Sequence, residues 1–403
     1  MKKTDWRRTQ QQVPPFGRND NELLGGNDNG VIGSNDEQSS WAQISATAGA
    51  AVWAGMAVLA RMGVARIGAI ELMFLFAPLV IAPLGIELGR RMASDGRLGA
   101  LARRLQPLGA GLAVAAICLP PGKRAGIVAL GWLFVCLLMA GEGVMRLLRT
   151  PWKDAGRACP ELAEGSARAT LVRTTLAVAR IDLAVGGAWL VASRWGMRPM
   201  GIQEPIGLLT AVHFHFAGFA TATIAAATLQ FAERGGEVRR WLRGVVGLVI
   251  AMPFVVAAGF VISPVLKMGA AILFSASVAG LAIAVRACGT KAEDRTARVL
   301  LQVAAGAVFA GMVLSGSYAV ADYLGSEVLT IPQMARTHGV LNAVGFCLPG
   351  LLGWLVEKSR GQELWRRGRS ESEVRGQKSE VRSQNSPPLS HRAREGWGRV
   401  IGP

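Results

Sequence analysis

Histidine is rare in this chain, and its placement is unusual. Two of the four histidines in 403 residues, His213 and His215, lie in the apolar run TAVHFHFAGF. A third, His338, lies in MARTHGVLNAVGF, four residues before Asn342. Neutral imidazole exchanges protons with an unperturbed pKa of about 6.5, and it is a common ligand of zinc and haem iron. It also hydrogen-bonds across helices. These residues therefore indicate a substrate or proton pathway, a metal or haem site, or a packing role, and the sequence leaves all three open.

Ionisable side chains occupy other apolar runs as well. They are Glu71, Glu87, Glu142, Arg180, Asp182 and Asp322. An ionisable group at membrane depth costs roughly 2.5 to 3.5 kcal/mol on insertion scales, so each one is a candidate functional residue. Glu87 and Glu142 fall near the ends of their runs, where arginines of the adjoining loops are within reach. We expect these two carboxylates to have structural roles.

The segments that carry these residues are long enough to cross a membrane. Hydrophobic residues make up 51% of the chain and charged residues 18%, whereas soluble domains carry roughly a quarter charged residues. Several apolar runs reach the roughly 20 residues that span ~30 Å of hydrocarbon. About ten spans are predicted, beginning near Ala42, Ile67, Leu105, Ala125, Thr174, Ile206, Gly244, Met268, Val299 and Arg336. Because backbone amides in lipid must be satisfied within each segment, the predicted fold is an all-α, polytopic integral membrane helix bundle.

The polar and apolar residues are segregated along the chain. Residues 41–356 form the predicted transmembrane bundle, and the third span, Leu105 to Pro120, is short. Residues 1–40 are polar, and residues 357–403 are basic and contain the repeat SEVRGQ, SEVRSQ. Both are predicted to be disordered. Lys and Arg concentrate in alternate loops by about two to one, which predicts that both termini are cytoplasmic.

The formal net charge of +17 indicates topology and not nucleic-acid binding, because the basic residues lie in loops and a tail. The expected partners are the lipid bilayer, anionic lipid headgroups at the basic loops and an unspecified small molecule. The five cysteines show no paired spacing, which argues against a disulfide framework or a thiolate metal site. Nucleotide-driven transport is disfavoured, since no GxxxxGK[ST] loop is present.

With this orientation, five ionisable residues share the outer half of the membrane: Glu71, His213, His215, Asp322 and His338. Asp182 lies nearer the middle. His213 and His215 point about 200° apart on a regular helix, so they cannot both ligate one metal ion. We expect one of them to join His338, Glu71 and Asp322 in an interior polar site. Asn342, one turn from His338, is positioned to orient its imidazole.

Two stretches resemble the YndJ-like family of bacterial polytopic membrane proteins. They are LLTAVHFHFAGF (Leu208 to Phe219) and MARTHGVLNAVGF (Met334 to Phe346), and ELMFLFAPLVIAPLGIEL (Glu71 to Leu88) is similar as well. The resemblance would cover most of the membrane region, Glu71 included, and neither tail. It implies a multi-pass protein of a bacterial cell (inner) membrane. It marks His213, His215, His338, Gly339 and Asn342 as the family pattern, and it implies no catalytic role, because the family is essentially uncharacterised.

Two functions remain as hypotheses. One is a small-solute or proton-coupled transporter, in which the pathway residues are His213, His215, His338, Glu71, Asp322, Asn342 and Asp182. Pro78 and Pro83 mark a possible break in the second span, as in the discontinuous helices of transporters. The other is a membrane-embedded metal- or haem-binding protein with redox or hydrolytic activity, for which His213, His215 and His338 are the candidate ligands. The sequence specifies neither a substrate nor a cofactor, and it does not decide whether the chain is an enzyme.

Overall fold

The computed structural model describes residues 31–149, 160–235, 240–326 and 328–359, with side chains from residue 41 onwards except at 149 and 160–169. The chain divides into two units after Trp41, and the bundle below is the unit that begins at Ala42. The predictions for residues 1–30 and 360–403 lie outside the described residues. Helix α1 begins at Val31, ten residues before the predicted start of the bundle.

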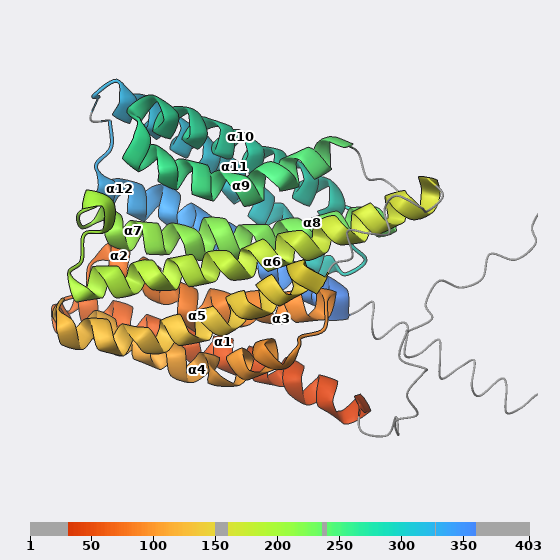
Figure 1. Cartoon of the computed structure of the whole chain (residues 1–403), viewed down its shortest axis with the longest axis horizontal. Helices are drawn as coiled ribbons and strands as arrows, with labels where there is room; N and C mark the ends of the chain where they lie inside the picture. Colours follow the sequence, from red (N-terminus) through yellow and green to blue (C-terminus); the bar gives the residue numbers. More distant parts are fainter. Residues whose placement is uncertain (1–30, 150–159, 236–239, 327, 360–403) are drawn as a thin grey trace, which may run out of the picture. The chain divides into compact units, whose positions relative to one another are not determined.

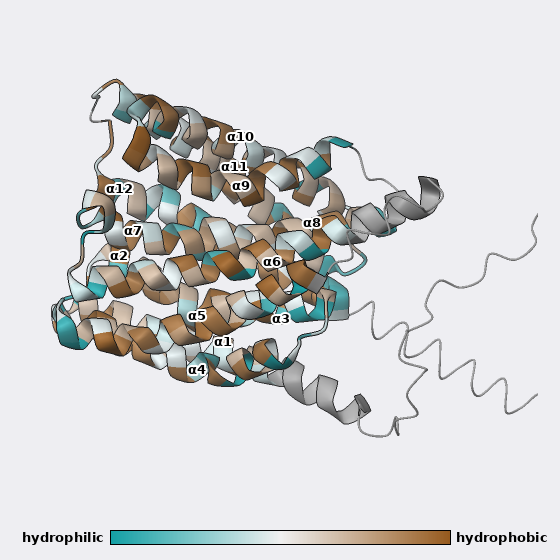
Figure 2. Cartoon of the chain, in the orientation of Figure 1, coloured by the Kyte–Doolittle hydropathy of each residue, from teal (hydrophilic) through white to brown (hydrophobic). Residues whose placement is uncertain are grey.

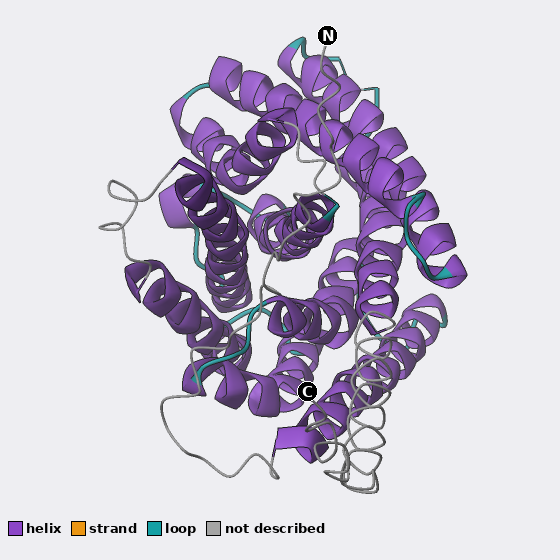
Figure 3. Ribbon diagram, turned by 90° about the vertical axis from the view of Figure 1, so that its right-hand side faces the viewer, coloured by secondary structure: helices purple, strands orange, loops and turns teal. Residues whose placement is uncertain are grey.

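The described residues form helices joined by short turns and loops and contain no strand, as Figure 3 shows. The all-α prediction is therefore confirmed. The first half of the chain contains α1 (Val31–Arg61), α2 (Ala69–Phe76), η2 (Ala77–Ile81), α3 (Ala82–Met92), α4 (Arg97–Cys118), α5 (Lys123–Arg149), α6 (Pro160–Trp195) and η3 (Pro199–Gly201). The second half contains α7 (Ile206–His213), η4 (Phe214–Ala220), α8 (Thr221–Arg234), α9 (Arg240–Ile262), α10 (Pro264–Gly289), α11 (Arg295–Tyr323), α12 (Ile331–Met334), η5 (Ala335–Gly339), η6 (Leu341–Cys347) and a helix over 348–359.

Nine helices among the described residues are long and apolar enough to cross a membrane. Helix α4 corresponds to the third of the ten predicted spans and is not among these nine. The prediction placed it at Leu105 to Pro120, whereas it runs from Arg97 to Cys118. The helix therefore takes in Arg103 and Arg104, which the sequence had suggested were loop residues. Hydropathy alone missed this extension because a helix that projects into the headgroup region tolerates arginine.

The ends of the helices are polar and their middles are apolar, as Figure 2 shows. Successive membrane spans run in opposite directions (Figure 1). The end of one span and the start of the next therefore lie at the same end of the bundle. One end holds the end of α3, the start of α4 and their arginines. We call it the basic end. The other, which we call the opposite end, holds the starts of α7 and α12. This alternation is what places residues from distant spans at a common depth.

Three helices differ from the others by carrying π-helical segments. In the span at 69–92 this segment is η2, in the span at 206–234 it is η4, and in the span at 331–359 there are two, η5 and η6. The first two of these spans are the most buried, with 72% and 78% of their apolar windows inside the bundle, against 17% for α1. A π turn leaves the regular i to i+4 pattern and is frequent at functional sites. The core of the bundle is therefore also its least regular part.

Proline explains the segment η2. The amide of Ala82 bonds to the carbonyl of Ala77, which deprives the Pro78 carbonyl of its α-helical donor. The π-helical donor would be Pro83, which has no N–H. The side chain of Gln106, from α4, donates to the Pro78 carbonyl instead, at 2.8 Å. The predicted irregularity at Pro78 and Pro83 is thus present, and the helix continues through it.

Helix α1 packs directly against this distortion. Ser45 donates to Gln106 Oε1 at 2.9 Å, so one amide side chain links α1 to η2. Gly49 faces the carbonyl of Leu79, and an added Cβ would lie 2.0 Å from that oxygen. Only a glycine permits this approach, as small residues do at helix contacts in membranes.

Candidate functional site

His215 is enclosed in the core, and both of its ring nitrogens are bonded. Its exposed fraction is 1%. Nδ1 lies 2.7 Å from the carbonyl of Ala211, and Nε2 accepts a hydrogen bond from the indole of Trp132 at 2.9 Å. The ring of Phe74 meets it edge-on at 5.2 Å. These contacts require the neutral tautomer with its proton on Nδ1. His215 therefore joins α5 to η4 and has no lone pair left for a metal ion.

A glycine on α6 makes room for this imidazole. A Cβ at Gly186 would lie 2.4 Å from His215 Nδ1, which is closer than any van der Waals contact. Helices α5, α6 and η4 thus meet around one buried side chain.

His338 and Asn342 form a second polar cluster. Nδ1 of His338 lies 2.9 Å from the carbonyl of Gly311 on α11. The amide nitrogen of Asn342 donates to the His338 carbonyl at 2.7 Å and lies 3.1 and 3.2 Å from the two ring nitrogens. Gly311 packs closely against this cluster, and a Cβ there would lie 3.1 Å from the side-chain nitrogen of Asn342. The predicted contact between Asn342 and the His338 imidazole is present.

His213 lies on the side of its helix away from the His215 site. It is exposed, and its Nδ1 lies 2.7 Å from the carbonyl of Leu209, which leaves Nε2 available. It is close enough to His338 for the two imidazoles to interact electrostatically. We call His213 and His338 the imidazole pair. The expected divergence of His213 and His215 is thus observed, and His213 is the one that faces His338.

Asp182 is an ionisable residue in the core of the bundle. It is fully buried, at 0% exposure, and neither carboxyl oxygen has a hydrogen-bond partner among the described residues. Asp182 packs closely against η4, because a Cβ added at Gly218 would lie 2.7 Å from the Cβ of Asp182. Asp182 lies in the middle of the span at 170–195. An ionised carboxylate without a partner is costly there, which favours the neutral acid.

Glu71 belongs to a different group at the opposite end. Its carboxylate folds back towards Gly68, and it interacts electrostatically with Arg194 of α6, as does Glu204. Arg194 is only 6% exposed, and its Nε has no partner among the described residues. Glu204 accepts a hydrogen bond from the amide of Leu208 at the start of α7.

Asp322 is separate again. It forms an ion pair with Lys267 at 2.7 Å, and both side chains are partly exposed. This pair joins α11 to α10 at the opposite end.

The interior site expected from the sequence is therefore divided. The structure brings His213, His338 and Asn342 together, and it places His215, Glu71, Asp322 and Asp182 in separate surroundings. No group of three His, Cys, Asp or Glu side chains that could hold a metal ion occurs within the described part of the chain. Helix rotation decided this outcome, because residues at one depth can face different neighbours.

Comparison with known proteins gives the family. A family model described as YndJ-like protein matches residues 72–346. The chain belongs to the YndJ-like family. The uncharacterized membrane protein YndJ of Bacillus subtilis (strain 168) is 27% identical over 187 residues, which are 46% of this chain and 33% of that protein. The alignment thus spans about a third of that relative's length. No solved structure matches the chain.

The matched range fits the predicted resemblance with one difference. It begins one residue after Glu71, which the resemblance had been expected to include. The imidazole pair, His215, Asp182 and the segments η2, η4 and η5 all lie within the YndJ-like range. The irregular core is therefore part of what the family model describes.

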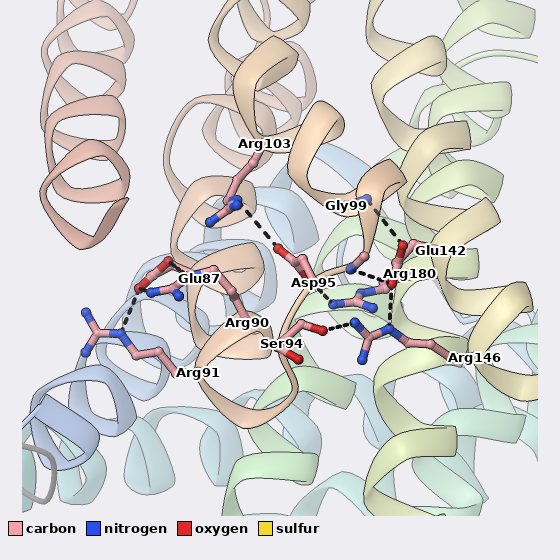
Figure 4. Close-up of polar contacts among 11 residues, drawn as sticks. Glu87, Arg90, Arg91, Ser94, Asp95, Gly99, Arg103, Glu142, Arg146 and Arg180 are labelled. Atoms are coloured by element: carbon pink, nitrogen blue, oxygen red, sulfur yellow. Dashed lines mark hydrogen bonds and ion pairs between the residues drawn. The ribbon is translucent and has the colours of Figure 1, made fainter. Parts of the chain in front are cut away.

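The basic end contains a network of paired charges, shown in Figure 4. Glu87 accepts from both Arg90 and Arg91 at 2.8 Å. Glu142 bonds Arg146 at 2.9 Å and also accepts from the amide of Gly96, which starts α4. Both carboxylates meet nearby arginines, as the sequence predicted for residues at span ends.

Asp95 is the centre of this network, and sequence reasoning missed it. It lies 2.9 Å from Arg180 of α6 and 3.5 Å from Arg103 of α4. Burial raises the pKa of Asp95, and the guanidinium groups of Arg180 and Arg103 oppose that change. The pair explains why α6 carries an arginine inside its apolar run. A short connector with an acid between two arginine-bearing helices was the available signal.

Two further residues of the core were not anticipated. Arg194 lies at the end of α6 and is buried. Trp132 is fully buried within the span at 123–148, whereas membrane tryptophans favour the interfaces. A tryptophan deep inside an apolar run was therefore a sign that its indole N–H has a polar partner.

Proposed function

We propose that this YndJ-like protein is a transporter that moves a small solute across the membrane in exchange with, or together with, protons. The proposed pathway runs through the spans at 69–92, 206–234 and 331–359 and along the adjoining face of α6. Its proton-carrying groups are Asp182 and the imidazole pair.

The observation that carries the proposal is the isolation of Asp182. A buried carboxyl group without a hydrogen-bond partner contributes nothing to packing that an apolar side chain would not supply. It does provide a group that can take up or release a proton when water or a solute reaches it. The contact with Gly218 would couple that event to η4.

The imidazole pair supports the same proposal. Imidazole can take up and release a proton, and the imidazoles of His213 and His338 are close enough to interact electrostatically. His213 directly precedes η4, and His338 lies in η5. Because π turns are frequent at functional sites, titratable groups that adjoin them support the proposal.

The proposed orientation places the basic end in the cytoplasm, since Lys and Arg favour cytoplasmic loops. The imidazole pair then faces the outside of a bacterial inner membrane. The metal or haem alternative has less support from the geometry. His215 has no free nitrogen, and His213 and His338 are joined by no third ligand among the described residues.

Proton flux tests the proposal. The full chain would be reconstituted in liposomes that enclose a pH-sensitive dye, with the membrane potential clamped, and a pH gradient would be imposed. Proton entry would be recorded without solute and with pools of amino acids, sugars and carboxylates. We expect protein-dependent entry that falls about tenfold or more in Asp182→Asn, which keeps the side-chain volume and removes the titratable group.

Two matched variants define the result. Asp182→Glu retains a carboxyl group and should keep part of the flux, while Asp322→Asn removes an acid from the partly exposed pair with Lys267 and should leave flux unchanged. An equal flux in Asp182→Asn and the original protein, with both folded, would overturn the proposal. So would the absence of protein-dependent flux with every pool.

A further inference from the structure

Three helix ends bring cations together at the basic end. Lys358, in the helix over 348–359, donates a hydrogen bond to Gln230 Oε1 of α8. Arg234 follows Gln230 by four residues, so the two share one face of α8. Lys358 therefore lies beside Arg234.

Arg91 of α3 reaches the same place from the third helix. Its Nη1 donates to the hydroxyl of Ser359 and to the carbonyl of Leu355 at 3.2 Å. Ser359 is adjacent to Lys358 in the chain. Both guanidinium groups are close enough to Lys358 to repel it. We call Arg91, Arg234 and Lys358 the basic triad.

Among the described residues, Glu87 is the carboxylate that hydrogen-bonds to the triad. Glu87 is shared between Arg90 and Arg91, so one carboxylate serves two guanidinium groups. The hydrogen-bond acceptor of Lys358 is a neutral amide. Glu233 adjoins Arg234 on α8 and has contacts of its own. Within the described part of the chain, the three cations therefore have one carboxylate hydrogen-bonded to them, through Arg91, and it also bonds Arg90.

The helix dipole accounts for part of this arrangement. Each cation lies in the last turn of its helix, where the carbonyl ends stabilise it by roughly 0.3 to 1 kcal/mol. That effect explains one cation at each end, and it does not explain why the three converge. Mutual repulsion among them is relieved when an anion binds between them.

We infer that the basic triad binds a phosphate group, with Ser359 and Gln230 beside it, and that an anionic phospholipid headgroup supplies this phosphate. Phosphate is the anion for which several Arg and Lys donors are suited. The lipid source follows from position, because the ends of three membrane helices lie where headgroups lie. The inference does not depend on the proposed transport.

Lipid binding to the full chain tests the inference. Native mass spectrometry of detergent-purified protein would measure apparent affinity for phosphatidylglycerol and for phosphatidylcholine, and calorimetry would measure inorganic phosphate. We expect phosphatidylglycerol to bind more tightly than phosphatidylcholine, and to bind about tenfold more weakly to Lys358→Gln. The matched control Arg124→Gln, an exposed cation near the start of α5, should change the affinity by less than about twofold.

The melting temperature separates a lost site from a lost fold. Lys358→Gln removes a repelled charge, so the lipid-free variant should melt no lower than the original protein. Unchanged phosphatidylglycerol affinity in Lys358→Gln and Arg234→Gln would overturn the inference. Inorganic phosphate that binds as tightly as the lipid, and displaces it, would overturn the lipid source and keep the phosphate site.

Discussion

At the basic end, the carboxylates of Glu87, Asp95 and Glu142 each lie 2.8 or 2.9 Å from an arginine nitrogen. In the middle of the same bundle, neither oxygen of Asp182 has a hydrogen-bond partner in the part of the chain that the structure describes. Both regions place ionisable groups where water is scarce, and they differ in whether each charge is matched. A buried carboxylate that is paired with an arginine leaves the fold about as stable as an apolar contact would. A buried acid without a partner lowers the stability of the fold and forms no contact that offsets this loss.

This difference separates structural groups from candidate functional ones better than depth does. The same distinction applies within the histidines. His215 has both nitrogens bonded to the protein, and His213 has a free one. Variants that break a matched group should therefore lower stability, and variants at an unmatched group should change activity.

The largest loss of stability is expected for Arg180→Ala. Arg180 and Asp95 are 4% and 3% exposed in their side chains, so the variant leaves a buried carboxylate with the weaker contact to Arg103. A cost of about 3 to 5 kcal/mol is expected for breaking such a pair, measured by thermal or chemical unfolding in detergent. The double variant Arg180→Met, Asp95→Leu should recover most of it, and equal losses in both variants would contradict the pairing.

His215→Ala should have the next largest effect. It leaves the Trp132 N–H without an acceptor and opens a cavity, at a cost of about 2 to 4 kcal/mol. His213→Ala should lie within about 0.5 kcal/mol of the original protein, because His213 is exposed. Melting temperatures of the two variants compare residues two positions apart on one helix. Equal destabilisation would show that His213 is a packing residue too.

Gly186→Ala should cost about 1 to 3 kcal/mol, because the new methyl group displaces the His215 imidazole. The control is Gly55→Ala on α1, where a Cβ would meet nothing within 4 Å and alanine favours the helix. Unfolding measurements on both variants should therefore move in opposite directions. A stable Gly186→Ala would mean that the imidazole has room to move.

Among the charged pairs, the smallest effect is expected for Lys267→Met. Its ion pair with Asp322 is 28% and 37% exposed, and exposed pairs contribute about 0 to 1 kcal/mol. A loss above about 2 kcal/mol by the same unfolding measurement would place this pair with the matched groups of the basic end.

Much of the architecture was predictable because it depends on properties of single segments, which can be summed residue by residue along the sequence. Run length and hydropathy predicted the spans, since crossing lipid needs only enough apolar residues. The start of α4 was not predicted, because its first turns carry arginines. Thr330 caps the last span, and Gln333 completes the capping box. That span therefore begins at Ile331, five residues before the predicted start at Arg336.

The candidate site was predictable only in part. The sequence supplied its residues and their depth, and it separated His213 from His215 through helical periodicity. It did not supply Trp132, Arg194 or Asp95, since their roles come from neighbours on other helices.

The sequence by itself determined that this is an all-α membrane protein, where most of its apolar spans lie, and that ionisable groups occur inside them. Hydropathy and helical rise act locally, so they can be read from one segment at a time. The tertiary structure alone decided that Asp182 is unmatched, that Asp95 is matched and that His213 faces His338. Pairing depends on the rotation of each helix about its axis, and the π turns change that rotation by altering the number of residues per turn.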